Sequence, residues 1–454
     1  MVIRYLFNIF YVFTLLTFVV QSQGNRQMQP IILQYADSLV GVRGANNEIR
    51  EFSGNVVLLQ GDVTVECDNA VQYLNENRAV LSGNVHINQR ELDLFTPRGV
   101  YYGNSKIASS FSGMKMMDGK TVLTAKEGTY STETLIADFR NNVKIEDDSA
   151  IIYADRLIYH RKNKNSFAYG NVLIRGKYSN TYLLGDTLEH YPSKNITIVK
   201  AEPRLFQIDT IAVDSVGYSS DDSLDLDRNT SDSNYVVRLD TLSIKAKYMK
   251  SIIDSENKQE IYYFIDSVEF RQKELAAKAD TAVYYKTAGK VELIGVPIVW
   301  YDSTQLYADS ITIFLPDMKI KELRAIGNSI ACSRDDTLDL QNINQVVGDE
   351  IIIKFENDSI NAIFGFGNAK SLYFITEDSS GAGVQSSSCD SLIVSFDSGE
   401  VDKINWLGGV NGEFYPSHLI IDPKEFYLPG FRWSEAKPRK IRLSIEREDK
   451  HNKE

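Results

Sequence analysis

The side chains that most often carry chemistry in proteins are dispersed along this chain. His86, His160, His190 and His418 lie far apart, and neither a Gly-x-Ser-x-Gly nor a His-Glu-x-x-His motif accompanies them. A Gly-x-x-x-x-Gly-Lys loop that could hold nucleotide phosphates is also missing. The sequence therefore predicts a protein that is not an enzyme, with no catalytic residues and no cofactor.

One acidic segment resembles the start of a calcium-binding loop. Residues 225–229 read Asp-Leu-Asp-Arg-Asn, which places oxygen ligands at alternate positions. Thr230, however, occupies the position of the loop's glycine, and Val236 occupies that of the bidentate glutamate. We therefore expect no metal site.

The three cysteines have the spacing of neither a zinc site nor a disulfide framework. Cys67, Cys332 and Cys389 are an odd number spread over more than 300 residues. We expect ordinary core or surface residues. A disulfide between two of them is left open, because the sequence does not fix their proximity.

The composition favours a strand-rich protein that does not bind nucleic acid. The 454 residues include 61 acidic and 49 basic ones, a formal charge of −12, and no Lys/Arg cluster stands out inside the repeats described below. The chain has 25 Tyr and 21 Phe but only 10 Pro. Aromatic side chains suit a pleated surface, whereas proline cannot donate to a strand ladder.

Residues 1–22 have the pattern of an export signal. Arg4 precedes an uncharged stretch from Tyr5 to Val20, and small residues follow where a signal peptidase would cut. We predict cleavage after Ser22 and an extracytoplasmic location. A retained membrane anchor is the alternative, although the apolar stretch is shorter than the roughly 20 residues that span a bilayer.

Two kinds of phrase recur along the chain at a nearly constant step. Gly83 follows Gly54 by 29 residues, and a second landmark, a tyrosine, steps by 29, 28 and 29 residues. A fixed period in this range indicates a repeat architecture. The glycine phrases are Gly54-Asn55-Val56, Gly61-Asp62-Val63, Gly83-Asn84-Val85 and Gly170-Asn171-Val172, and the tyrosines are Tyr73, Tyr102, Tyr130 and Tyr159.

Within each repeat, apolar and polar residues alternate as they do on half-buried strands. Val85 and Ile87 share one face, whereas Asn84 and His86 share the other. Two such apolar faces can close as a sandwich core or stay apart as a groove for an apolar ligand, and parity does not distinguish these outcomes. The candidate ligand-contacting residues are Val63, Val65, Val85, Ile87, Val143, Ile145, Val172 and Ile174.

The repeats divide into two units around a polar segment. We predict a first repeat unit at residues 30–210, an acidic linker at 211–236, a second unit at 237–435 and a charged tail at 436–454. Each repeat of about 29 residues holds two strands, so the predicted fold is all-β, mostly antiparallel and elongated.

These phrases together resemble the OstA/LptA-like proteins of lipopolysaccharide export, with gaps, from about Gln34 to about Pro429. The resemblance implies a V-shaped β-jellyroll in the periplasm, with association with the outer membrane left open. It also implies a carrier or bridge whose apolar groove holds the acyl chains of lipopolysaccharide or a related glycolipid. The implied partners are an inner-membrane export complex, an outer-membrane translocon and further copies of the chain joined end to end.

Two other classes of protein stay open at this point. A parallel β-helix that binds or cleaves glycans also has period-locked strands, although its coils repeat at about 20 to 25 residues. A structural or adhesive surface protein without lipid cargo would have the same alternation. Lipid that co-purifies from the native host would distinguish a carrier from such a scaffold.

Overall fold

The computed structural model describes most of the chain between residues 29 and 443. The predicted signal peptide and residues 215–234 of the predicted linker, which include the calcium-like segment, lie outside the described residues. No helix in the described part is long and apolar enough to cross a membrane. The described residues are 29–43, 48–214, 235–254, 256, 259–334, 341–375, 382–441 and 443.

The N-terminal half of the described chain is built almost entirely of strands. Valine, isoleucine, tyrosine and threonine are frequent in these segments, and their burial alternates with the two-residue period of a strand. The elements are β1 (Ile32–Tyr35), β2 (Ser38–Arg43), β3 (Glu48–Gln60), β4 (Val63–Tyr73), β5 (Arg78–Gln89), β6 (Leu92–Tyr102), β7 (Ile107–Ser110), β8 (Met114–Asp118), β9 (Thr121–Ala125), β10 (Glu127–Ser131), β11 (Ile136–Glu146), β12 (Ala150–His160), β13 (Asn165–Gly176), β14 (Thr181–Tyr191), the 3-10 helix η1 (Pro192–Lys194), β15 (Ile196–Lys200) and β16 (Arg204–Asp214).

The C-terminal half continues the same pattern and then ends in a segment without strands. Three short 3-10 helices are the only helical elements described in this half. The elements are β17 (Tyr235–Lys245), β18 (Tyr248–Asp254), β19 (Gln259–Gln272), β20 (Leu275–Tyr285), β21 (Lys290–Ile294), β22 (Ile298–Tyr301), β23 (Thr304–Tyr307), β24 (Ser310–Phe314), η2 (Pro316–Met318), β25 (Glu322–Arg334), β26 (Ile343–Glu356), β27 (Ser359–Ile375), β28 (Gly383–Asp397), β29 (Glu400–Leu407), β30 (Asn411–Pro416), η3 (Ser417–Leu419) and η4 (Pro423–Phe426).

The strands form two layers that share their long members. In β5, Arg78–Ser82 pairs within one layer, here called layer B, and Val85–Gln89 pairs within the other, layer A. Every strand pair in the described residues is antiparallel, which confirms the predicted fold class and excludes the parallel β-helix for this part of the chain.

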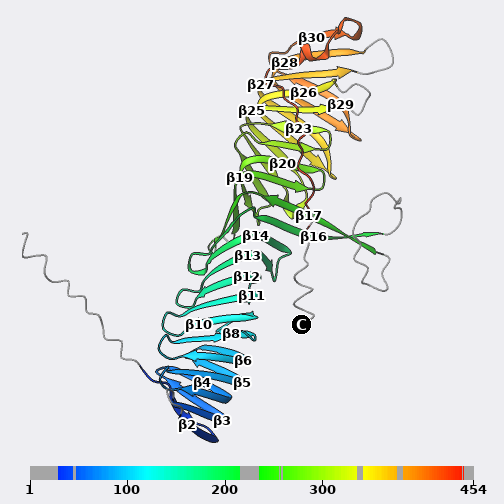
Figure 1. Ribbon diagram of the computed structural model, residues 1–454. Coiled ribbons are helices and arrows are strands. Elements are labelled where there is room, and N and C mark those ends of the chain that lie inside the picture. Colours follow the sequence, from blue (N-terminus) through cyan, green and yellow to red (C-terminus); the bar gives the residue numbers. More distant parts are fainter. Residues whose placement is uncertain are drawn as a thin grey trace, which may run out of the picture.

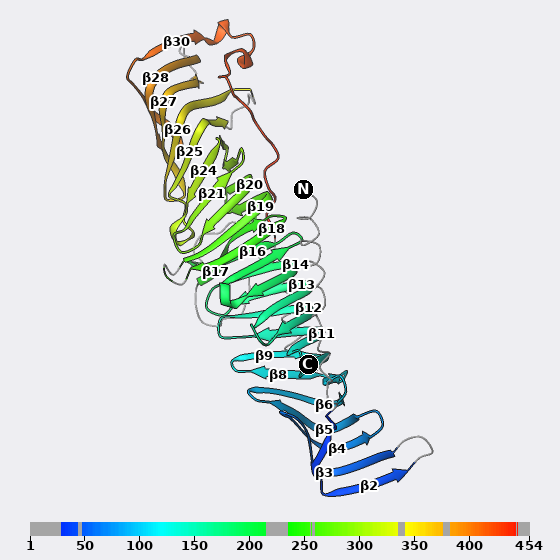
Figure 2. The ribbon, with the colours of Figure 1, turned by 90° about the vertical axis from the view of Figure 1, so that its left-hand side faces the viewer.

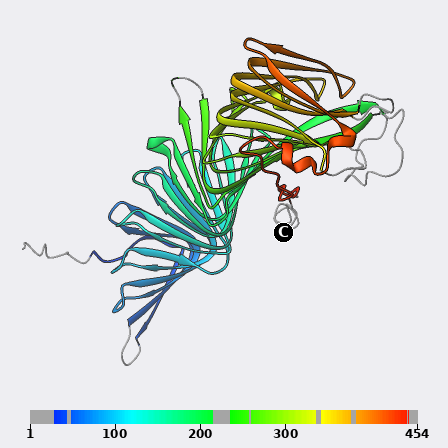
Figure 3. The ribbon, with the colours of Figure 1, turned by 90° about the horizontal axis from the view of Figure 1, so that it is seen from above.

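Both layers run the length of the molecule, which is an elongated stack (Figure 1, Figure 2). Layer A passes from the first predicted unit to the second where β16 pairs with β17, and layer B does so where β15 pairs with β18. Seen from above, the strand direction turns gradually along the stack, as the twist of sheets requires (Figure 3). The exact boundaries of the two predicted units stay a prediction.

Each long strand bends sharply where it crosses from one layer to the other, and we call this bend the corner. In β5 the corner is Gly83-Asn84, where both residues have positive φ, 77° and 48°, and the register of pairing shifts. A Cβ on Gly83 would lie closer than 3.0 Å to the carboxylate of Asp68 in β4, so the position requires glycine. The Asn84 side chain donates to the same carboxylate, at 3.0 Å.

The same arrangement recurs along the stack. At each such corner, the carboxylate of an aspartate in or next to the preceding strand occupies the space beside the glycine where a Cβ would lie. Gly61-Asp62-Val63 is an exception, since Gly61 lies in the turn between β3 and β4. The glycine and aspartate pairs are Gly54 with Asp37, Gly83 with Asp68, Gly170 with Asp155, Gly295 with Asp280, Gly327 with Asp309, Gly367 with Asp349, and Gly408 with Asp390.

Two corners without glycine show how the residues depend on one another. Lys126 and Lys247 occupy the aspartate position, and their backbone N–H groups donate to the carbonyls of Asn141 and Asp266, which replace the glycine. Asn141 and Asp266 have positive φ, and Asp266 forms an ion pair with Lys247 at 2.9 Å. At these two corners a lysine accompanies a polar corner residue, whereas at the corner of Ala201, which also has positive φ, the corresponding position holds Asp186.

We predict that Gly83→Ala destabilises the protein by at least about 2 kcal/mol, because left-handed backbone strain adds to the overlap with Asp68. The measurement is the free energy of unfolding in urea, followed by circular dichroism. Gly119→Ala is the matched control, because Gly119 has a φ of 61° but open space around it. Asp68→Ala should restore part of the loss in the Gly83→Ala protein. An equal loss in the Gly83 and Gly119 variants would contradict the role of the aspartate.

Candidate functional site

The space between the two layers contains all eight candidate ligand-contacting residues. Their side chains point inward, as the alternation predicts, and they belong to or pack against one hydrophobic cluster. The exposed fractions are 2% for Val63, 2% for Val65, 1% for Val85, 2% for Ile87, 1% for Val143, 7% for Ile145 and 2% for Val172, and Ile174 is half-buried.

The interior is closed at these positions, because side chains from the two layers fill it. Val85 and Ile87 of layer A lie in the same cluster as Ala79 and Leu81 of layer B. The sequence left two alternatives, a closed sandwich core and a groove between separated layers. At these positions the structure has the closed core. That these residues also contact acyl chains stays a prediction.

The layers meet again on the side opposite the corners, which we call the mouth. Here Tyr101 at the end of β6 donates to Oε1 of Gln60 at the end of β3, at 2.7 Å. The Gln60 amide donates in turn to the carbonyl of Gly103, at 2.9 Å. Tyr101 is 1% exposed and Gln60 is 4% exposed, so this polar contact is sealed from water. It ties the tip of layer A to the tip of layer B.

These mouth hydrogen bonds repeat along the stack with the period of the sequence. Gln60, Gln89 and Asp118 are 29 residues apart, and so are their tyrosine partners. Burial raises the pKa of these tyrosines, so their hydroxyls stay protonated and can donate. Bonds across the mouth are Tyr101–Gln60, Tyr130–Gln89, Tyr159–Asp118, Tyr284–Gln207, Gln272–Met318 carbonyl and Tyr301–Asp358 carbonyl.

The tyrosine landmarks predicted from the sequence are correct in two of four repeats. Tyr130 and Tyr159 point inward, but Tyr102 is 41% exposed, and its neighbour Tyr101 takes the inward position. In the first repeat the inward residue is Gln72, not Tyr73, and its amide donates to the carbonyl of Ile31. The sequence reading was one residue out of phase because Tyr101 and Tyr102 are adjacent tyrosines.

The next position along the mouth holds a histidine. His190, near the end of β14, lies in the cross-strand row that continues from Tyr159 through Ser166. Burial lowers the pKa of His190, and the negative charge of Asp147 offsets only part of this effect. Its Nδ1 lies 2.9 Å from the hydroxyl of Thr197 within layer B. The half-buried Ile152 and Ile174 lie in this part of the stack, so the interior is less closed here than at Val85 and Ile87.

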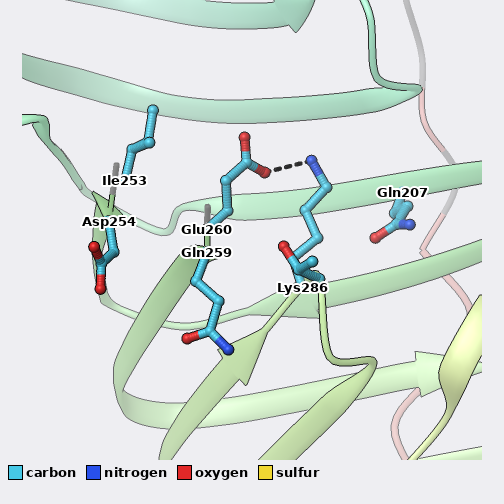
Figure 4. Close-up of a pocket in the computed structure, with 7 residues that line it drawn as sticks. Gln207, Ile253, Asp254, Gln259, Glu260 and Lys286 are labelled. Carbon is cyan, nitrogen blue, oxygen red and sulfur yellow. Dashed lines mark hydrogen bonds and ion pairs between the residues drawn. The ribbon is translucent and has the colours of Figure 1, made fainter. Parts of the chain in front are cut away.

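A hollow of about 570 Å³ lies at the mouth between β16, β18, β19 and β20. Figure 4 shows Gln207, Glu260 and Lys286 around it, with Glu260 and Lys286 forming an ion pair at 2.5 Å. Only Ile253 of its labelled lining residues is apolar, so this hollow suits a polar group rather than an acyl chain.

Metal and thiol chemistry have no support in the described residues. No group of three or more His, Cys, Asp or Glu side chains there could hold a metal ion. Cys67, Cys332 and Cys389 are all buried free thiols, so the disulfide left open by the sequence is not formed. Burial raises the pKa of Cys67 to about 11 and that of Cys332 to about 12, which makes both thiols unreactive.

Sequence reasoning missed the polar residues that hold the two layers together. The corner aspartates were not predicted as partners of the glycines. The mouth column of Gln60, Gln89 and Asp118 was missed, although its 29-residue step could have revealed it.

Comparison with known proteins supports the family suggested by the repeated phrases. A family model described as OstA-like protein matches residues 28–110 and 106–155. The match confirms the predicted resemblance over residues 28–155. No curated protein matches the sequence.

Solved structures also match, and one of them is similar over a limited part of the chain. It is LptH from Pseudomonas aeruginosa, described as the LptA homologous periplasmic component of the lipopolysaccharide transport device. The identity is 14%, the match covers 31% of this chain and 95% of LptH, and the TM-score is 0.25. Our conclusions therefore rest on the fold itself and on the family match.

We predict that Tyr130→Phe destabilises the protein by about 1–3 kcal/mol, because it leaves the buried Oε1 of Gln89 without its donor. Tyr102→Phe is the control, since the exposed Tyr102 should change stability by less than about 0.5 kcal/mol. Urea unfolding of the two variants measures the difference. A Tyr130 variant as stable as the Tyr102 variant would show that the mouth hydrogen bond does not hold the layers together.

Proposed function

We propose that this protein is a periplasmic carrier or bridge that moves lipopolysaccharide or a related glycolipid toward the outer membrane, without catalysing a reaction. The observation that carries this proposal is the continuity of the apolar interior. One hydrophobic cluster extends from Ile31 near the first strand to Val394 in β28, with Trp406 of β29 packed against it. The OstA-like match of residues 28–155 points to the same class of protein.

Acyl chains would lie between the layers, in contact with the eight candidate residues. Removing a methylene group from water yields about 0.8 kcal/mol, so a chain of about a dozen methylenes gains ~10 kcal/mol. A single mouth hydrogen bond contributes only about 0.5–1.5 kcal/mol net. Residues such as Val85 and Leu81 would exchange their contact with one another for contact with the chain. The balance therefore permits lipid to separate the layers locally.

The polar head group of such a lipid would stay outside the mouth. A glycan cannot enter an apolar interior without leaving its polar groups unpaired. Acyl chains inside and a head group outside require an open mouth at the point where the lipid sits. The region near His190, Ile152 and Ile174 is where we expect the mouth to open first, because the two isoleucines are only half-buried and the hydrogen bond of His190 to Thr197 stays within layer B.

The two ends of the stack suit the proposed partners. In the described residues, β1 and β2 pair only with β3, and β29 and β30 pair only with β28. Unpaired edges invite strand addition. Apolar side chains are exposed on these strands, including Val40 at 54% and Phe414 at 45%. Each end could therefore join a further copy, an inner-membrane export complex or an outer-membrane translocon.

Site-specific photocrosslinking tests the proposal. A small diazirine amino acid placed at Ile174 or Val85 should form adducts with glycolipid in the native host. Asn84 is the polar control on the outer side of the corner, and Phe95, 38% exposed on the outer face, is the apolar control. We expect adducts at the interior positions and none at the controls, detected by mass spectrometry.

Equal labelling of both faces, or no lipid at any position, would remove the carrier proposal. The second outcome would favour the structural surface protein, which has the same fold without lipid cargo. Circular dichroism of each substituted protein confirms that the small probe leaves the strands intact.

A further inference from the structure

The C-terminal segment forms a strap over the outer surface of layer A. From the end of the stack it runs back along the side of the molecule (Figure 2). Tyr427, Phe431 and Trp433 pack on a cluster that includes Tyr307 and Cys332. We use the name strap for residues 427–441.

Hydrogen bonds fix the position of the strap on the strands. The backbone N–H of Leu428 donates to Gln345 at 2.9 Å. The carbonyl of Ser434 accepts from the indole of Trp300 and from the amide of Gln305, both at 3.0 Å. Trp300 is 3% exposed, so the strap seals this part of the outer surface.

The strap covers a guanidinium group that has no partner for two of its nitrogens. Arg271 of β19 lies on the outer face of layer A, and its Nε and Nη1 are buried without a hydrogen-bond acceptor. Its cross-strand neighbours are Ser243 and Ala276, neither of which carries a charge, and the charge of Glu274 acts on it without a hydrogen bond to Nε or Nη1. Burying two guanidinium nitrogens without an acceptor is costly, and this cost falls when an anion binds beside them.

A row of charged residues lies beside Arg271 on the same face. Arg204, Lys245, Glu269 and Lys278 are successive cross-strand partners on β16, β17, β19 and β20. Together with the strap they line a hollow of about 500 Å³. The lining residues are Arg204, Lys245, Glu269, Lys278, Glu435, Ala436, Lys437, Pro438, Arg439 and Ile441.

Cations exceed anions in this hollow, although the whole chain carries a formal charge of −12. Five lining residues are cationic and two are anionic, a difference of three, and Arg271 adds another cation. One of the anions, Glu435, already contacts Arg334 at 3.5 Å and accepts from Trp433. Exposed Glu202 lies 3.6 Å from Arg204 and 3.4 Å from Lys245, and such exposed pairs are weak.

We propose that the hollow between the strap and β16, β17, β19 and β20 is a binding site for a phosphate group, either free or carried by a lipid head group. Guanidinium and ammonium groups together match the several acceptor oxygens of a phosphate. The hollow is large enough for a substituted phosphate. Burial and the nearby Arg271 lower the pKa of Lys437. A bound anion would stabilise the charged form of this lysine.

This site is separate from the interior, because it lies on the opposite face of layer A. It needs no acyl chain, so it can exist whether or not the protein carries lipid. If the phosphate belongs to a lipid, the site would hold lipids or membranes on the outside of the stack.

The test measures phosphate binding by the full chain and by variants with a single charge removed. In the first arm, inorganic phosphate replaces chloride at constant ionic strength, and the melting temperature is recorded. In the second arm, the protein is floated with phosphatidylcholine vesicles that contain or lack phosphatidic acid. The variants are Arg271→Gln and Lys278→Gln, and the control is Arg98→Gln, which removes an exposed arginine of the first predicted unit.

We expect the wild-type and Arg98 proteins to bind phosphate in at least one arm. Arg271→Gln should weaken that binding about tenfold or more, and Lys278→Gln about threefold. Arg271→Gln should not lower the melting temperature without phosphate, because it removes a half-buried cation whose Nε and Nη1 lack acceptors. Binding in the first arm alone would identify free phosphate as the ligand, and binding in the second would identify a lipid head group.

The proposal is overturned if neither arm shows binding, or if both variants bind as tightly as the Arg98 control. Neither result bears on the interior, because the two interior photocrosslinking positions, Ile174 and Val85, lie on the other face of layer A. Failure of this proposal and failure of the carrier proposal are therefore distinguishable.

Discussion

The fold depends on the corner, where a glycine in left-handed conformation lets each long strand cross from one layer to the other. The carboxylate of the preceding strand occupies the space that a Cβ would need, as Asp68 does beside Gly83, and accepts from the following asparagine. Because this contact recurs between successive repeats, the two layers stay joined along one side of the whole stack. The alternating strands then direct their apolar side chains into the wedge between the layers.

The two layers are joined at the corners, and they must also be kept together on the opposite side, at the mouth. The mouth hydrogen bonds hold the layers together on this side through buried pairs such as Tyr101 and Gln60. Each bond is strengthened by the exclusion of water, but it is a single bond and can be broken at a small cost in free energy. The interior is therefore packed but held on this side by small, repeated polar contacts. Such a structure can open one repeat at a time, which is what a carrier of long acyl chains would need.

The local features of this architecture could be predicted from the sequence, whereas its long-range contacts could not. Alternation placed Val85 and Ile87 inward correctly because strand parity depends only on neighbouring residues. The mouth pairs join residues at least 41 positions apart. Choosing Tyr102 in place of Tyr101 shows that a shift of one residue moves the side chain to the opposite face of the strand. The strap was predicted only as the end of the second unit and a charged tail, since its position depends on packing against Trp300 and Tyr307.

The central claim is that lipid enters the interior by separating the layers at the mouth. Cysteines at Arg90 and Glu133 can be joined across the mouth with a short bifunctional maleimide. Both residues are exposed and directly follow Gln89 and Thr132, which are hydrogen-bonded across the mouth, and the three buried native thiols do not compete. The control joins Ser109 and Thr129, which are paired neighbours within layer B. The measurement is the glycolipid bound per protein, determined by mass spectrometry. We predict that crosslinking across the mouth prevents loading while the control does not, and equal loading of the two proteins would contradict the account.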